Sequence, residues 1–197
     1  MKEIDYPEGA TPLNPDEING LLLTHITEKS ELDRWEQENI IEALAWLEKQ
    51  KTKDILNELF MKQLHKRMFG NVWEWAGSLR KAEKNLGVHW YLIPTELQKL
   101  CDNVEYWIEN KTFSEDEIAV RFHHLLVSIH LFPNGNGRHA RIMADTLLEL
   151  YLQKSRFTWG SNANLTEPGE VRDRYIQSLR EADNHKGYKH LLDFARS

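Results

Sequence analysis

Residues 115–153 read EDEIAVRFHHLLVSIHLFPNGNGRHARIMADTLLELYLQ and contain the clearest structural pattern in the chain. Apolar residues recur at helical spacing from Ile118 to Ile129, so the spacing predicts a helix that begins at residue 115 and runs into His130. The segment Pro-Asn-Gly-Asn-Gly at 133–137 cannot continue that helix and must turn. Residues 138–153 are again helical in pattern. The stretch therefore predicts two helices joined by a glycine-rich turn.

Helical patterns also flank this unit on both sides. They cover residues 33–49, 54–69, a segment starting at Thr95, 167–183 and 186–196. Two short strands, 78–81 and 88–93, are predicted to form one hairpin around a turn at 83–87. Residues 1–15 carry three prolines and are typical of an extended arm. We therefore expect a mainly α fold, a helical bundle with a small β-hairpin flap.

The composition predicts a water-soluble globular domain. The chain has 197 residues, of which 41% are hydrophobic and 28% charged, close to the average for such domains. The net charge of -6, with acidic and basic residues mixed, argues against a nucleic-acid surface. No apolar stretch approaches the roughly 20 residues of a membrane span, and the N-terminus lacks a signal-peptide pattern, which favours a cytoplasmic location. The single cysteine, Cys101, is expected in the core and excludes a cysteine-rich zinc site.

The glycine-rich turn has the chemistry of an anion site. Gly135 and Gly137 allow close approach of the backbone to a ligand, and Asn136 is a suitable N-cap, so the next helix would present free N–H groups. Arg138 and Arg141 lie three residues apart near this positive helix end. Two cations there are unfavourable unless an anion neutralises them, so we interpret them as phosphate clamps.

His130 is placed to act as a base beside that anion site. A neutral imidazole at the end of the first helix can accept a proton from an incoming hydroxyl near physiological pH. The side-chain oxygen of Asn134 is a candidate ligand for Mg²⁺. A base, backbone donors, cations and a metal-facing oxygen together indicate phosphoryl-transfer chemistry.

The same residues carry a family resemblance. The segment resembles the Fic motif, His-x-Phe-x-Asp/Glu-Gly-Asn-Gly-Arg-x-x-Arg, and matches it at His130, Phe132, Gly135, Asn136, Gly137, Arg138 and Arg141. Residues 64–80 resemble the Fic segment before the substrate-binding hairpin. The chain as a whole, including Gly-Ala-Thr-Pro-Leu at 9–13, is similar to the Fic subgroup labelled mobile mystery protein B.

The resemblance implies the Fido fold and transfer of AMP from ATP, with Mg²⁺, to a Ser, Thr or Tyr hydroxyl of a protein. It implies that His130 deprotonates the hydroxyl and Phe132 anchors the loop. Residues 135–137 and Arg138 would bind the α- and β-phosphates, and Arg141 the γ-phosphate. The hairpin flap, which aligns the target by strand addition, would be represented by Arg80, Lys84, Asn85, Leu86 and Gly87.

Two positions call for separate interpretation. Asn134 stands where most family members have Asp or Glu, so it keeps an oxygen but loses a charge that Mg²⁺ prefers. Many Fic enzymes are restrained by a glutamate that pairs with the second arginine of the motif. Thr27-Glu-Lys-Ser-Glu31 matches the first part of that inhibitory pattern, so we expect Glu31 to block Arg141. The chain would then divide into an arm with an inhibitory segment, 1–32, and a Fido domain, 33–197.

Three alternatives remain open at this point. The first is another Fido activity of the same site, either transfer of a different phosphoryl group or removal of AMP. The second is a weakly catalytic nucleotide-binding or interaction module, and an antitoxin-like regulator is a further candidate partner. The histidines at 123, 124, 130 and 139 also raise a metal-dependent hydrolase, although no His-Glu-x-x-His pattern accompanies them.

Overall fold

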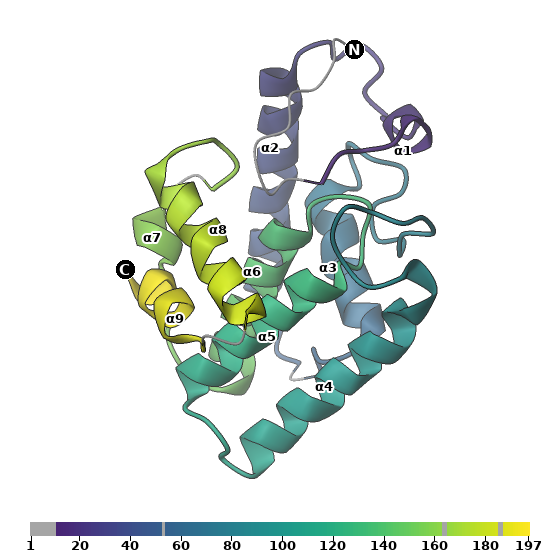
Figure 1. Ribbon diagram of the computed structural model, residues 1–197. Helices are drawn as coiled ribbons and strands as arrows, with labels where there is room; N and C mark the ends of the chain where they lie inside the picture. The colour runs from purple at the N-terminus through teal and green to yellow at the C-terminus, as the bar shows by residue number, and fades with distance from the viewer. Residues whose placement is uncertain (1–10, 53, 163–164, 185–186) are drawn as a thin grey trace.

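The computed structural model describes residues 11–52, 54–162, 165–184 and 187–197 (Figure 1). Within these ranges the protein is mainly helical, as predicted. The helices are α1 (Pro15–Asn19), α2 (Lys29–Leu47), α3 (Glu58–Phe69), α4 (Ile93–Glu109), α5 (Glu115–Ile129), α6 (Asn136–Thr146), α7 (Trp159–Asn162), α8 (Glu170–Asp183) and α9 (Lys189–Arg196). A 3₁₀ turn at Trp90–Leu92 precedes α4, and a π-helical turn at Leu147–Tyr151 follows α6.

Side-chain caps determine where several of these helices begin. Asn57 accepts a hydrogen bond from Phe60 N at the start of α3, and Ser114 accepts one from Glu117 N at the start of α5. Helix α4 begins at Ile93, with a proline in its first turn, and so starts two residues before the predicted Thr95. Of the predicted arm 1–32, residues 1–10 lie outside the described residues, and its end falls within the first turns of α2.

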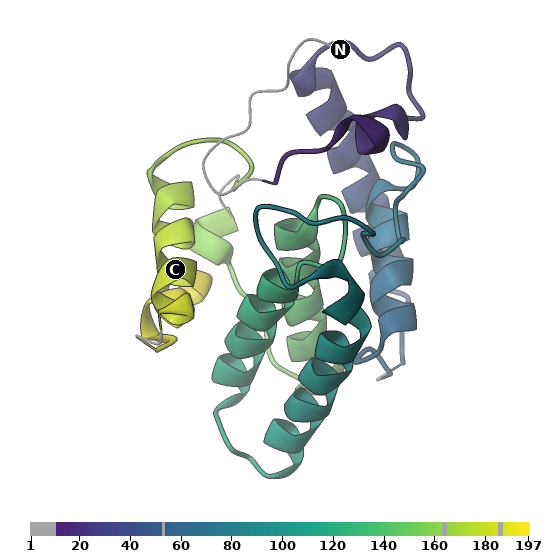
Figure 2. The same ribbon diagram turned by 45° about the vertical axis from the view of Figure 1, so that its right-hand side comes forward.

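Two apolar cores enclose the unit formed by α5 and α6. The larger core is formed mainly by α2, α3, α4 and the inner faces of α5 and α6, and the smaller core joins α5 and α6 to α7, α8 and α9. Figures 1 and 2 show α2 and α3 on one side of this pair and α8 and α9 on the other. Fully buried side chains of the two cores include Leu64, Met68, Phe122, Phe132 and Met143, and Leu148 and Leu191. The glycine-rich turn between α5 and α6 is therefore held from both sides.

The predicted β-hairpin is wrong in its secondary structure. Residues 78–89 form a loop, and residues 90–92 are the 3₁₀ turn rather than the end of a strand. In the described ranges, β pairing is limited to one isolated bridge between Leu21 and Trp73. We call residues 78–89 the flap loop from here on.

The side chain of Arg80 explains why strands do not pair here. Its guanidinium donates to the carbonyl oxygens of Ala82, Val88 and His130. The backbone N–H of Arg80 donates to the carbonyl of Leu131, and that of Val88 donates to the carbonyl of Ile129. Neither group donates across the predicted hairpin. Because these groups are already bonded, a hairpin ladder has few partners left. The flap loop is instead fastened to the end of α5.

None of the helices in the described ranges has both the length and the apolar character needed to cross a bilayer.

Candidate active site

The loop between α5 and α6 is closed by its own side chains. Phe132 is fully buried, as predicted, and stacks on His65 with ring centroids 3.7 Å apart. The Asn136 side chain accepts from Phe132 N at 2.9 Å and donates to Phe132 O at 2.8 Å. These contacts give the loop a defined shape in which His130 and the start of α6 lie side by side.

The N-terminus of α6 differs in detail from the prediction. Gly135, with φ 79°, is the N-cap, and Asn136 is the first helical residue, because the amide of Asn136 is committed to Phe132. No residue in the described ranges caps this end through a side chain, so the N–H groups of residues 136–138 are left for a ligand. The predicted anion site therefore has its donors, although the cap was assigned to the wrong residue.

His130 ends α5 in a left-handed backbone conformation, with φ 60° and ψ 68°. The residue is buried, with only 5% of its surface exposed. Burial, followed by the positive charges of Arg80 and Lys84, lowers its pKa to about 4. The imidazole is therefore neutral at pH 7.

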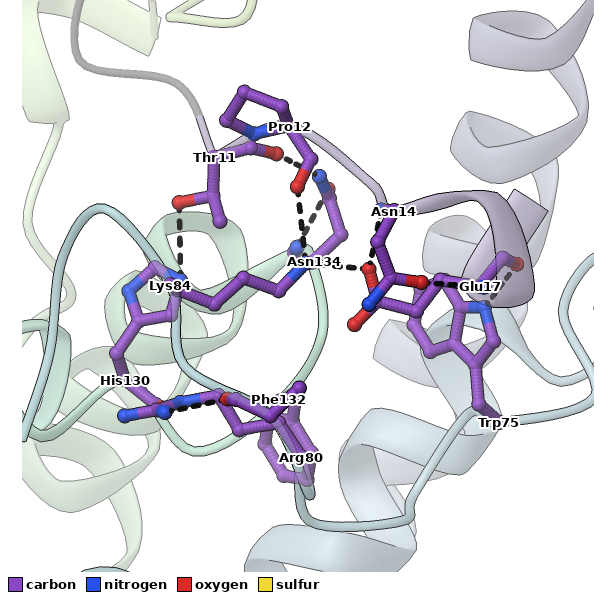
Figure 3. Close-up of polar contacts among 12 residues, drawn as sticks. Thr11, Pro12, Asn14, Glu17, Trp75, Arg80, Lys84, His130, Phe132 and Asn134 are labelled. Atoms are coloured by element: carbon purple, nitrogen blue, oxygen red, sulfur yellow. Dashed lines mark hydrogen bonds and ion pairs between the residues drawn. The ribbon is translucent and has the colours of Figure 1, made fainter. Parts of the chain in front are cut away.

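The two imidazole nitrogens of His130 have different surroundings. Nε2 lies 3.0 Å from the hydroxyl oxygen of Thr11 (Figure 3). Nδ1 is buried without a hydrogen bond to any described group. With the proton on Nδ1, Nε2 is the acceptor, which is the arrangement that a general base requires.

Arg138 and Arg141 both line the space in front of α6. Arg138 forms an ion pair with Glu36 of α2, whose other oxygen accepts from Trp73 Nε1 at 2.6 Å. Arg141 lies over the ring of Tyr175, with Cζ 5.4 Å from the ring centroid. The structure therefore brings both predicted arginines to one place, each with a partner.

The glutamate that reaches the motif is not the one predicted. Glu31 makes no ion pair with Arg141 or Arg138, whereas Glu36 pairs with Arg138. On α2, Glu36 belongs to the buried face together with Leu32 and Ile40, while Glu31 lies beside that face. The spacing of 32, 36 and 40 in the sequence is the signal that could have identified it.

Two flap residues predicted to contact a target have other roles. Arg80 is 2% exposed and holds the flap loop through the carbonyl bonds described above. Lys84 forms an ion pair with Glu17 and donates to Pro12 O at 2.9 Å, so its side chain faces the segment before α1. Both charged groups are bonded within the chain and are therefore not available to bind another protein.

The remaining flap residues lie at the mouth of the site. Asn85 and Leu86 are exposed, and Leu86 and Gly87 line the cavity. Gly87 has φ 105°, and a Cβ atom there would lie 2.6 Å from His130 Cβ. This close approach requires glycine at position 87.

Asn134 is fully engaged within the chain. Its Oδ1 accepts from Gly135 N at 2.7 Å and lies 3.5 Å from Arg138 Nη2, and its Nδ2 donates to Thr11 O at 2.9 Å (Figure 3). Within the described ranges no group of three His, Cys, Asp or Glu is placed to hold a metal. As positioned, these residues do not fit a Mg²⁺ site built by the protein.

A cavity of about 490 Å³ joins these elements. Its walls come from the α5–α6 loop and first turn of α6, the flap loop, the segment before α1, α2 and α8. Residues that line it include Thr11, Glu36, Gly87, His130, Gly135, Asn136, Gly137, Arg138, Arg141, Arg172 and Tyr175. The volume is within the range of small-molecule sites, so the base, the open helix end and the cations face a space that can admit a ligand.

Comparison with known proteins agrees with this geometry. The family model described as Fic/DOC family matches residues 55–148, which contain the flap loop, His130 and both arginines. These residues form a Fic/DOC family domain. The mainly helical Fic fold extends beyond them, as the solved structures below show.

Relatives named protein adenylyltransferase match part of the chain. The Fic protein of Aedes aegypti is 34% identical over 100 residues, covering 49% of this chain and 19% of that protein. The fic-1 protein of Caenorhabditis briggsae is 32% identical over 125 residues, covering 61% of this chain and 23% of that protein. The chain thus spans about a fifth of the length of the curated relatives that it matches.

Solved Fic structures share the fold over most of the chain. BepC from Bartonella tribocorum, solved with bound AMPPNP, has a TM-score of 0.69 at 17% identity and covers 93% of this chain and 97% of that one. A Fic domain from Bartonella quintana, solved with bound ADP, has a TM-score of 0.63 at 18% identity and covers 91% of this chain and 94% of that one. At these identities the likeness concerns the fold.

Among the cavity residues outside the matched Fic domain, three contact His130, Arg138 or Arg141 and were missed from the sequence. They are Thr11, Glu36 and Tyr175. Each reaches the site from a distant segment, before α1, in α2 and in α8. Local sequence patterns do not predict such long-range contacts. The exception is the helical spacing of Glu36 with two apolar residues, which indicates that Glu36 is buried.

Proposed function

We propose that this protein is a protein adenylyltransferase that transfers AMP from ATP to a Ser, Thr or Tyr hydroxyl of a target protein. The observation that carries the proposal is the convergence of a neutral, buried imidazole, an open helix N-terminus and two arginines on one cavity. The adenylyltransferase relatives and the nucleotides named in the solved Fic structures support the same nucleotide chemistry.

His130 is the general base of the proposed reaction. Its Nε2 accepts the proton of the target hydroxyl as that oxygen attacks the α-phosphorus of ATP. The bond between the α-phosphorus and the oxygen leading to the β-phosphate breaks, and pyrophosphate leaves. The product is a phosphodiester between AMP and the target side chain.

The first turn of α6 would hold the phosphates. The N–H groups of residues 136–138 point to the cavity end of the helix, where the helix dipole favours negative charge. Arg138 would neutralise the α- and β-phosphates and Arg141 the γ-phosphate, which requires Arg138 to exchange Glu36 for the nucleotide. Gly137 leaves this turn open, since a Cβ there would meet nothing closer than 3.9 Å.

The flap loop would align the target. Asn85, Leu86 and Gly87 form its exposed part beside His130, where an extended target segment could run along the backbone. Arg80 would act indirectly, because it fixes the loop to the end of α5. We also propose that residues 1–32 act as an arm on a Fido domain of residues 33–197.

The predicted metal role of Asn134 has no support in its surroundings, because both ends of its amide are bonded within the chain. Mg²⁺ usually accompanies ATP and binds proteins through carboxylates and the phosphates, and position 134 offers no carboxylate. Omitting Mg²⁺ and adding a chelator tests whether transfer needs the ion at all. No step assigned above to His130, α6 or the arginines depends on the answer.

Transfer of label from ATP tests the proposed function directly. Purified protein is incubated with a cell lysate and ATP labelled at the α-phosphate, in parallel with ATP labelled at the γ-phosphate. We expect α-label on a lysate protein, no γ-label, and a loss of about 10²–10⁴-fold in His130→Ala. Label that persists in His130→Ala, or γ-label alone, would contradict the assignment.

Two observations favour a second candidate, a nucleotide-binding interaction module. Glu36 already occupies Arg138, and Asn134 lacks the charge that Mg²⁺ prefers. For such a module, calorimetry would detect ATP binding while no label is transferred at any metal concentration. An antitoxin-like regulator, which we also predicted, would be sought by co-purification with that form.

A further inference from the structure

A hydroxyl of the chain itself already occupies the position next to the proposed base. Thr11 Oγ1 lies 3.0 Å from His130 Nε2, and the residue is 7% exposed. The two residues are 119 positions apart, so the contact comes from the fold and not from local sequence. In the tautomer with the proton on Nδ1, Nε2 accepts and the Thr11 hydroxyl donates its proton toward the base, as an attacking hydroxyl must.

The backbone around Thr11 is also held by the site. Asn134 Nδ2 donates to the carbonyl of Thr11 at 2.9 Å, and Lys84 Nζ donates to the carbonyl of Pro12 at 2.9 Å. Glu17 completes this attachment through its ion pair with Lys84. Figure 3 shows the two carbonyls and the hydroxyl facing the glycine-rich turn, the flap loop and His130. Two consecutive peptide units are therefore bound between the turn and the flap loop.

The space beside this hydroxyl is continuous with the proposed nucleotide site. Thr11, His130, the first turn of α6 and both arginines line the same cavity. A nucleotide bound to that turn would share this cavity with Thr11 and His130. The threonine has a base on its hydroxyl, an anchored backbone and access to the phosphate space.

The geometry points to Thr11 as a modification site: the protein transfers AMP from ATP to its own Thr11 within one molecule. This inference rests on the proposed adenylyltransferase function and specifies an acceptor for it. The Thr11 proton goes to His130 Nε2, a bond forms between Oγ1 and the α-phosphorus, and the bond from that phosphorus to the β-phosphate oxygen breaks. Pyrophosphate leaves, and Thr11 carries AMP through a phosphodiester.

Three variants test this assignment. Purified chain is incubated with α-labelled ATP, and the peptide containing Thr11 is examined by mass spectrometry for one adenylyl group. Thr11→Val keeps the branched shape without the hydroxyl, Thr11→Ser keeps the hydroxyl, and Thr112→Val changes an exposed threonine in the turn after α4. We expect wild type, Thr11→Ser and Thr112→Val to be labelled, and Thr11→Val to fall to the level of His130→Ala.

A mixing experiment tests that the transfer occurs within one molecule. The His130→Ala chain keeps the acceptor but lacks the base, and the Thr11→Val chain keeps the base but lacks the acceptor. When both are incubated together with labelled ATP, the His130→Ala chain should stay unmodified at Thr11. Label at Thr11 of that chain would show transfer between molecules and overturn the intramolecular route.

The remaining outcomes separate this inference from the function on which it rests. Label on a lysate protein with an unmodified Thr11 peptide overturns the inference and leaves the adenylyltransferase proposal standing. Label that persists on the chain in Thr11→Val, at another residue, also overturns it. Absence of α-label from both the chain and the lysate overturns both proposals. Circular dichroism of Thr11→Val, together with the labelling of Thr11→Ser, separates loss of the hydroxyl from loss of the fold.

Discussion

The environment of His130 predicts an unusual pH dependence at the scale of a single residue. Burial and nearby cations lower its pKa to about 4, so protonation of the free base should begin only in acid. We expect kcat/KM for AMP transfer to stay level from about pH 8 to about pH 5 and to fall about tenfold per pH unit below about 4. Rates at constant ionic strength measure this, and a fall centred near 6.5 would contradict it.

Gly137 offers a second test, because the fold does not require a glycine there. Its added Cβ would meet Arg141 and Tyr175 at 3.9 Å, so Gly137→Ala should stabilise α6 by up to about 1 kcal/mol. The same methyl group would enter the proposed phosphate space and weaken ATP binding by about tenfold or more. Thermal unfolding and calorimetry measure the two effects.

Gly135 provides the matched control for that experiment. It has φ 79°, and a Cβ there would lie 2.7 Å from the ring of Phe69, so Gly135→Ala should destabilise the protein. An unchanged ATP affinity in Gly137→Ala would place the phosphates elsewhere.

The sequence predicted the same ligand-binding role for both glycines. It could not distinguish them, because only the neighbours in space show that one glycine is required by the fold and the other is not.

At the scale of elements, the flap loop depends on one guanidinium. Arg80→Lys removes the planar fork that reaches three carbonyl groups, so we expect a loss of about 2–4 kcal/mol in the free energy of unfolding and faster proteolysis at residues 78–89. Urea unfolding and limited proteolysis measure these effects. Lys81→Ala, at the exposed neighbour, should change stability by less than about 0.5 kcal/mol.

Helix α2 supplies a second test at this scale. Glu36→Gln keeps an oxygen for Trp73 Nε1 but removes the charge that holds Arg138. We expect ATP affinity to rise by about tenfold, because Arg138 no longer exchanges one anion for another. Calorimetric titration with ATP measures this, with Glu38→Gln on the exposed face of α2 as control. Equal affinity in wild type and Glu36→Gln would exclude competition by Glu36.

The helices were more predictable than the flap. Apolar spacing gave the existence of α2, α3, α5, α6 and α8, because a helix forms its hydrogen bonds locally and buries one face. The flap loop has alternating residues that are typical of strands, but a buried arginine takes the carbonyl groups that a ladder would use. Such a contact depends on the position of α5, which the local pattern does not contain.

At the scale of the whole molecule, buried histidines predict sensitivity to acid. Burial is the main cause that lowers the pKa of His65, of His123 to about 3, and of His130 and His139 to about 4. Between about pH 6.5 and 4 the unfolded chain therefore binds protons that the folded chain does not. The free energy of unfolding consequently decreases as the pH is lowered through this range. Burial raises the pKa of Asp145 to about 6, which acts in the opposite direction for one group.

Four such histidines outweigh one carboxyl group. We expect the free energy of unfolding to drop by roughly a few kcal/mol between about pH 7 and about pH 4, since each unit of pKa shift corresponds to about 1.4 kcal/mol. Urea unfolding at several pH values measures this. His139→Gln should flatten the curve, whereas the exposed His25→Gln should not. Stability that rises on acidification would show that Asp145 or surface carboxylates dominate.

The sequence brought one half of the candidate site together, and it did not bring the other half. His130, Arg138 and Arg141 lie close together in sequence, so their proximity follows from one turn between two helices. Thr11 and Glu36 approach them across 119 and 102 positions, and that approach depends on how the arm and α2 pack. The motif of the candidate site is therefore encoded locally, whereas the residues that contact it are brought there by the tertiary structure.

The left-handed backbone of His130 has a consequence for engineering. A residue with a Cβ is disfavoured at these angles by about 1 kcal/mol or more, whereas glycine is not. A library selected only for heat resistance should therefore enrich glycine at position 130 and yield robust but inert proteins. Directed evolution of this scaffold needs a turnover screen in every round, because the proposed base is also a residue that selection for thermostability alone would discard.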